Sequence, residues 1–198
     1  MLTDPYIQQL VHIKKRVRKK EVLDMSSTFT KRYPRNVMEK IKAHSPDTML
    51  PKDIKMWFEE HDIEVVGKRK GNKKYDAVLT GDFLENTCEF FQRWEQIHNC
   101  VKQDGFIVTD LPFSVNSGWF SYQPNLFKQL AKQNNYDIIY FKMMDHAGQF
   151  PVTFEHTMRV TDTSLRNKLY KYQDTAFMRI NVTFKKTTNE PFSFKDPQ

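Results

Sequence analysis

Glycine is scarce in this sequence, with 6 glycines among 198 residues. Glycine normally stands where a backbone must approach a bound nucleoside or phosphate closely, so its scarcity bears on any site for such ligands. The sequence also has no Gly-Lys-Ser/Thr phosphate-binding loop and no Ser-His-Asp motif. Nucleotide hydrolysis is therefore disfavoured.

Cysteine is sparse as well, with Cys88 and Cys100 alone in the chain. The pattern predicts one helix through both, so their separation of 12 residues (100 − 88) places them roughly 18 Å apart along its axis. That distance excludes a disulfide between them. Neither cysteine joins a histidine in a metal-ligand spacing, so no metal site is predicted. The absence of a disulfide framework and of a signal peptide favours a cytoplasmic setting.

Long hydrophobic runs are missing too. No apolar stretch approaches the roughly 20 residues of a membrane span, which predicts a soluble protein. Hydrophobic residues still make up 39% of the chain, which is enough to build a core. The length suits one domain over residues 1–198. We expect it to comprise an N-terminal helix over 1–20, a sheet with its helices over 21–185 and a tail over 186–198.

Acidic side chains are outnumbered, and the formal net charge is +7. The excess gathers in two basic clusters, at residues 14–20 and 68–74. Such clusters attract phosphates electrostatically. They are equally typical of a solvated face beside the core elements. Nucleic acid is therefore one open partner class, beside a small-molecule acceptor.

Short apolar runs alternate with helical patterns along the chain. Helical spacing predicts helices through 37–41 and 54–58, a long helix after Gly81, one through 126–131 and one at 165–172. This alternation predicts a three-layer α/β fold with a mostly parallel sheet and an antiparallel pair at one edge. Ligands in such sheets bind beyond the carboxyl ends of the strands, so Asp24, Gly67, Thr80 and Asp110 mark the expected site. The strands are predicted at residues 21–25, 63–67, 75–80, 105–110, 136–144 and 176–185.

Residues 75–86, YDAVLTGDFLEN, resemble the fourth-strand motif of class I S-adenosylmethionine (SAM)-dependent methyltransferases. That motif is a Tyr/Phe-Asp pair, an apolar strand, small residues and the start of a helix. Further resemblances follow in the same order along the chain. They are VKQDGFIV at 101–108, LPF at 111–113, NSGWFSYQPNLF at 116–127 and NVTFKKTTNEPF at 181–192.

The resemblance implies a Rossmann-like methyltransferase sheet with SAM as cofactor. It carries the cofactor site onto the ends of the first, third and fourth strands. The first strand ends in an acid, Asp24, but the following Met25, Ser26 and Ser27 replace the family's glycine-rich loop. No strand between Ser27 and residue 63 ends in an acid that would hold the ribose hydroxyls. The implied cofactor-binding residues are Asp24, Met25, Ser26, Ser27, Gly67, Thr80 and Gly81.

Candidates for the methyl-transfer chemistry are Asp82, Asp110, Asn116 and Tyr122. Asp82 opens the helix after the fourth strand, where it either faces the site or stabilises the helix N-terminus. Asp110 at a strand end is a candidate general base. Asn116 and Tyr122 lie on an aromatic loop that either contacts the acceptor or packs as a hydrophobic lid.

Two functions follow from these patterns. The first is transfer of the SAM methyl group to an oxygen or nitrogen acceptor, mainly by proximity and alignment, because the sulfonium supplies the reactivity. The second is a methyltransferase-like module that has lost the cofactor and binds an anionic partner such as nucleic acid. The absent glycines and the absent ribose acid favour the second function.

Overall fold

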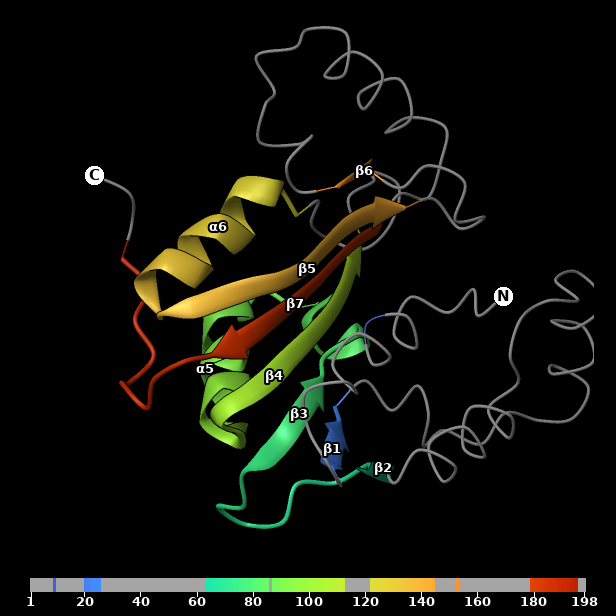
Figure 1. Ribbon diagram of the computed structural model, residues 1–198, viewed down its shortest axis with the longest axis vertical. Coiled ribbons are helices and arrows are strands. Elements are labelled where there is room, and N and C mark those ends of the chain that lie inside the picture. The colour runs from blue at the N-terminus through green and yellow to red at the C-terminus, as the bar shows by residue number, and fades with distance from the viewer. Residues whose placement is uncertain are drawn as a thin grey trace, which may run out of the picture.

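The structure is a computed structural model that describes Gln9 and residues 20–25, 63–85, 87–112, 122–144, 152–153 and 179–195 (Figure 1). Ser26, Ser27 and Asn116 lie outside the described residues. So do the helices predicted at 37–41, 54–58 and 165–172, and all of the predicted N-terminal helix except Gln9 and Lys20.

The described strands form one sheet in the order β2-β1-β3-β4-β7-β5-β6. Strands β2, β1, β3 and β4 run parallel to one another. The mixed α/β architecture with a mostly parallel sheet is therefore confirmed. The bounds are β1 Lys20–Asp24, β2 Ile63–Val66, β3 Tyr75–Leu79, β4 Val101–Pro112, β5 Tyr136–Met144, β6 Val152–Thr153 and β7 Arg179–Lys186.

The antiparallel part of the sheet is made by β7. It runs antiparallel to both β4 and β5 and lies between them. The predicted antiparallel pairing of the last two long strands is confirmed, and β7 is the inner member of the pair. The two-residue strand β6, which the sequence pattern did not indicate, pairs antiparallel with the outer side of β5.

The long helix predicted after Gly81 is two helices, α4 at Asp82–Glu85 and α5 at Phe90–Cys100. The prediction of one continuous helix was wrong, because residues 87–89 are not helical. The Glu89 amide N–H donates to Thr87 Oγ1 at 3.0 Å, and such local side-chain bonds compete with helix formation. Cys88 lies between the helices, and both cysteines are free thiols. The absence of a disulfide is thus confirmed, although the argument from a continuous helix does not hold.

Helix α5 and helix α6, Pro124–Gln133, bury their apolar faces in one hydrophobic cluster on the same face of the sheet. Phe184 of β7 lies at its centre, with ring centroids 5.6 Å from Trp94, 6.3 Å from Phe127 and 5.5 Å from Tyr136. Phe91 of α5 lies outside this cluster: it is 40% exposed and stacks on Phe194 of the C-terminal segment.

Gln9 contacts the opposite face of the sheet. It is helical and fully buried, and its Nε2 donates to the Thr109 carbonyl and to Asn181 Oδ1. Its Oε1 accepts a hydrogen bond of 2.6 Å from Thr183 Oγ1. Asn181 and Thr183 alternate along β7 with the core residues, which is the pattern of a strand covered on both faces. The N-terminal segment therefore contributes to the third layer at Gln9.

Candidate functional site at the carboxyl ends of β1 and β3

The order of the strands reverses at β1. From β1 the chain goes to β2 on one side, and then to β3 on the other side of β1. Such a reversal is the point at which open α/β sheets bind ligands, just beyond the carboxyl ends of the two strands. Asp24 pairs with Leu79 across this point, and the Met25 amide donates to the Leu79 carbonyl at 3.0 Å. The predicted pairs Asp24–Met25 and Thr80–Gly81 are thus brought side by side at the end of these strands.

Thr80 carries an unsatisfied polar atom at this position. The residue is fully buried, and its backbone N–H donates to the Val108 carbonyl at 3.1 Å. Among the residues that the structure describes, its Oγ1 has no hydrogen-bond partner. A buried unpaired hydroxyl costs about 1–3 kcal/mol, so most such groups have a partner. The free hydroxyl fits a site that is completed by a polar group of a ligand.

Gly81 gives the chain a sharp exit from β3. Its φ of +31° lies in the left-handed region, where a residue with a Cβ would be strained. The turn is closed by the Phe83 amide, which donates to the Thr80 carbonyl at 2.9 Å, and by the Leu84 amide, which donates to the Gly81 carbonyl at 3.1 Å. Because Gly81 has no Cβ, a ligand can approach the backbone closely at this strand end.

The β2 side of the site has a different character. The resemblance treats residues 63–67 as the third strand, but β2 pairs directly with β1, which is the place of the second strand in the Rossmann order. There an acid normally holds the ribose hydroxyls. In this chain Val66 is followed by Gly67, Lys68 and Arg69, all three exposed. The described residues thus fit a SAM-like ligand on the β1–β3 side and lack the ribose carboxylate on the β2 side.

Asp110 near the end of β4 belongs to a buried ion-pair network. Arg179 Nε donates to Asp110 Oδ1 at 2.7 Å, and Arg179 Nη2 donates to the Asp110 carbonyl at 2.9 Å and to Glu85 Oε2 at 3.0 Å. Burial alone would lower the pKa of Arg179, but the attraction of Asp110 and Glu85 outweighs it and raises that pKa. One guanidinium thus joins β7, β4 and α4 at the same end of the sheet as the carboxyl ends of β1 and β3.

Tyr122, at the end of the predicted aromatic loop, is buried beside this network. Its hydroxyl donates to the Leu84 carbonyl at 2.6 Å, and its ring lies 5.2 Å from that of Phe90. Burial, followed by the nearby charge of Glu85, raises the pKa of Tyr122 to about 12. The tyrosine is therefore held neutral against α4, in the arrangement of a packed lid residue.

The structure places the predicted site residues in two adjoining groups. Asp24, Met25, Thr80 and Gly81 lie at the ends of β1 and β3. Asp110 and Tyr122 lie one strand further along, linked to the first group through α4, which begins at Asp82. Sequence reasoning missed Arg179. An arginine inside a predicted strand carries no signal of its partners. These partners are Glu85 and Asp110, which meet Arg179 only in the fold.

The fold was compared with solved structures. A 1,6-didemethyltoxoflavin-N1-methyltransferase from Burkholderia thailandensis matches with a TM-score of 0.50 at 10% identity, over 93% of this chain and 78% of that chain. The chain has the fold of class I SAM-dependent methyltransferases. The SpnF cyclase matches with a TM-score of 0.49 at 10% identity, over 93% of this chain and 81% of that one. Coclaurine N-methyltransferase matches with a TM-score of 0.46 at 11% identity, over 92% of this chain and 70% of that one.

The sequence comparisons give no match: no protein-family model fits the chain, and no curated protein matches it in sequence. The methyltransferase likeness therefore stands on the fold alone. Among the described residues, no helix is both long enough and apolar enough to cross a membrane.

Proposed function

We propose that this protein is a SAM-dependent methyltransferase that transfers a methyl group to an oxygen or nitrogen of a small-molecule acceptor. The observation that carries the proposal is the unpaired, fully buried Thr80 hydroxyl beside Gly81, at the strand reversal where this fold binds its ligand. The Burkholderia methyltransferase of the same fold holds S-adenosylhomocysteine, which is the product form of SAM.

The residues at the crevice divide into two roles. Asp24, Met25, Thr80 and Gly81, together with Ser26, Ser27 and Gly67 from the flanking loops, form the proposed cofactor side. SAM, when bound, supplies an electrophilic methyl group that needs no covalent help from the protein. The work left to the chain is to orient the acceptor and exclude water.

The acceptor side is proposed to involve Asp82, Asp110, Asn116 and Tyr122. Arg179 donates one hydrogen bond to the Asp110 carboxylate and another to the Asp110 main-chain carbonyl. Together these bonds fix the direction of the carboxylate. A fixed carboxylate can hold the hydroxyl or amine proton of an acceptor and receive it as the methyl bond forms. Tyr122 supports α4 through the Leu84 carbonyl and so shapes the same wall.

A second function is favoured by one observation. The exposed Gly67-Lys68-Arg69 stands at the end of β2 where an acid would hold the ribose. A module that no longer binds SAM and instead binds an anionic partner would show this feature. The two functions are separated by whether SAM binds at all.

The test is isothermal titration of the protein and two matched variants with SAM and S-adenosylhomocysteine. Thr80→Val removes the unpaired hydroxyl at almost constant volume, so the free energy of unfolding stays the same or rises while SAM affinity falls about 3- to 10-fold. Thr109→Val is the control, because its buried hydroxyl donates to the Val182 carbonyl at 3.0 Å within the fold. It loses roughly 1 kcal/mol of stability and binds SAM as the wild type does.

Two results contradict the proposal. The first is the absence of binding heat with either ligand for the wild-type protein. The second is an unchanged SAM affinity in Thr80→Val, which would place the cofactor away from this strand end.

A further inference from the structure

The loop between β2 and β3 is a basic projection, and of its residues the proposed cofactor side uses Gly67 alone. All eight of its residues, 67–74, are exposed, and five of them are basic. A parallel crossover usually contains a helix, but this one is made by the loop alone. The loop therefore presents its side chains to solvent without a packing role.

The loop has a defined shape. The Lys73 amide donates to the Lys70 carbonyl at 3.0 Å, and Gly71 at the bend has a φ of +53° with no atom within 4 Å of a Cβ placed there. The Lys70 amide donates to the hydroxyl of the buried Tyr75 at 3.1 Å, which anchors the bend to the start of β3. The basic side chains are thus held on an anchored turn with an open tip.

The positive charge of this loop is mostly uncompensated. Lys73 forms an ion pair with Glu21 and lies 5.9 Å from the centre of the Tyr75 ring. In the part of the chain that the structure describes, the other four cations form no ion pair. They are Lys68, Arg69, Lys70 and Lys74.

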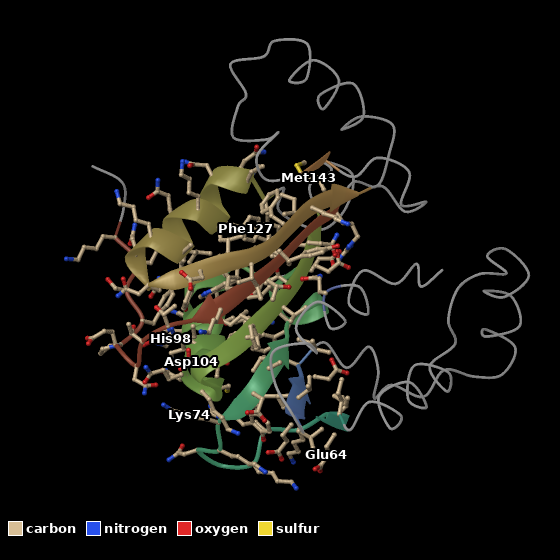
Figure 2. The ribbon with its side chains drawn as sticks, viewed as in Figure 1. Glu64, Lys74, His98, Asp104, Phe127 and Met143 are labelled. Atoms are coloured by element: carbon tan, nitrogen blue, oxygen red, sulfur yellow. The ribbon has the colours of Figure 1, made fainter. Side chains whose placement is uncertain are left out.

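Two acids of the neighbouring surface are paired with lysines outside the loop. Lys102 is paired with Asp76 at 2.9 Å, and Lys185 with Asp104 at 2.6 Å, so these acids are already engaged. Burial, and after it repulsion from Lys74, lowers the pKa of the buried Lys186 to about 8. The charge of Lys74 therefore also affects a group inside the protein. Figure 2 shows Lys74 on the same side of the molecule as His98 and Asp104. A concentration of like charge that costs stability in this way suits a surface that meets an anion.

We propose that the loop of residues 67–74 binds the phosphodiester backbone of a nucleic acid. Four free cations on one exposed turn match the negative charges that repeat along such a backbone. The loop has no aromatic side chain to stack on bases, so the contacts recognise phosphates and not sequence. Because β3 runs from this loop to Thr80, the end of the loop at Lys74 lies roughly 17 Å from Thr80, by the rise of five strand residues. The phosphate contacts of the loop cations do not depend on SAM binding.

The test compares two double variants of equal charge change by fluorescence anisotropy. Lys68→Glu with Lys70→Glu alters the loop. Lys128→Glu with Lys132→Glu alters two exposed lysines on α6, where no such cluster occurs. The probes are a labelled DNA duplex and an RNA duplex of the same sequence, titrated from about 50 to 200 mM salt.

The wild-type protein is expected to bind both duplexes with a strong salt dependence. The loop variant loses about 10-fold or more in affinity at about 100 mM salt, and its slope of log affinity against log salt becomes shallower by about 2 × 0.9. The α6 variant keeps most of the affinity and the slope. Unchanged binding in the loop variant, or equal weakening in both variants, would overturn the proposal.

Vesicles rich in phosphatidylserine form the second arm. Binding to these vesicles without binding to either duplex would overturn the nucleic-acid assignment in favour of a membrane surface. A failed SAM titration leaves this result untouched, and a failed duplex titration leaves the cofactor site untouched.

Discussion

At the scale of single residues, the candidate site combines a polar group that has no partner among the described residues with one that has several. Thr80 has a free hydroxyl, whereas Arg179 uses both Nε and Nη2 on neighbouring oxygens. The first arrangement is expected where a ligand binds, and the second where the wall of a site must be rigid. Arg179 is therefore a positioning residue that fixes Asp110 and Glu85.

Replacing Arg179 by Met is predicted to destabilise the protein by about 2–3 kcal/mol, because two largely buried carboxylates lose their counter-charge. Chemical denaturation measures the change. Lys102→Met is the control. The Lys102 side chain, which pairs with Asp76, is 46% exposed, and ion pairs of this kind contribute about 0–1 kcal/mol to the free energy of unfolding. Equal stability losses in the two variants would show that the Arg179 network is an ordinary surface pair.

At the scale of elements, the C-terminal segment after β7 is held against α5 and α6 by side-chain hydrogen bonds. Asn134 donates to the Ser193 carbonyl and accepts from the Ser193 amide, both at 2.8 Å, and Gln133 makes the equivalent pair with Lys195. His98 of α5 bonds through Nε2 to the Glu190 carbonyl at 2.8 Å and through Nδ1 to the Tyr136 hydroxyl at 2.6 Å. Since a carbonyl can only accept, Nε2 carries the proton and Nδ1 accepts from Tyr136 in the neutral ring.

This segment gives a prediction for the pH dependence of stability. Burial, followed by the charge of Lys186, lowers the pKa of His98 from 6.5 to about 4. The unfolded chain therefore binds a proton that the folded one does not, and stability present above pH 6.5 is lost as the pH falls towards 4. The loss approaches roughly 3 kcal/mol for the full shift.

Urea unfolding of the wild type and of His98→Gln at pH 7 and pH 5 measures this effect. Glutamine can donate to the Glu190 carbonyl and accept from Tyr136 but does not titrate in this range. The wild type should lose more stability between these pH values than the variant. Equal losses would mean that His98 titrates normally.

At the scale of the whole molecule, the strand pattern was predictable because parallel strands are short apolar runs that stand out between polar segments. β1, β2, β3 and β5 agree with the predicted ranges to within a residue at each end. β4 begins four residues earlier than predicted, since its polar first residues, Lys102–Asp104, lie on an exposed stretch. The break between α4 and α5 was missed because the apolar spacing continues across it while Thr87 bonds locally.

The candidate site was predictable only in part, for a related reason. Asp24, Thr80 and Gly81 follow strands directly, so the sheet topology alone brings them together. Arg179 and Gln9 bond to residues that lie 69 to 174 positions away along the chain. No local sequence pattern indicates contacts at such separations. The basic loop was visible as composition, but its lack of counter-charges required the positions of Asp76, Asp104 and Glu21.

The central claim is that SAM binds at the carboxyl ends of β1 and β3. Hydrogen–deuterium exchange with and without saturating SAM tests it most directly. We predict slower exchange in peptides that contain Asp24–Met25 and Thr80–Phe83, with no change at residues 70–74 of the basic loop. Protection confined to other peptides, or no protection anywhere, would contradict the account.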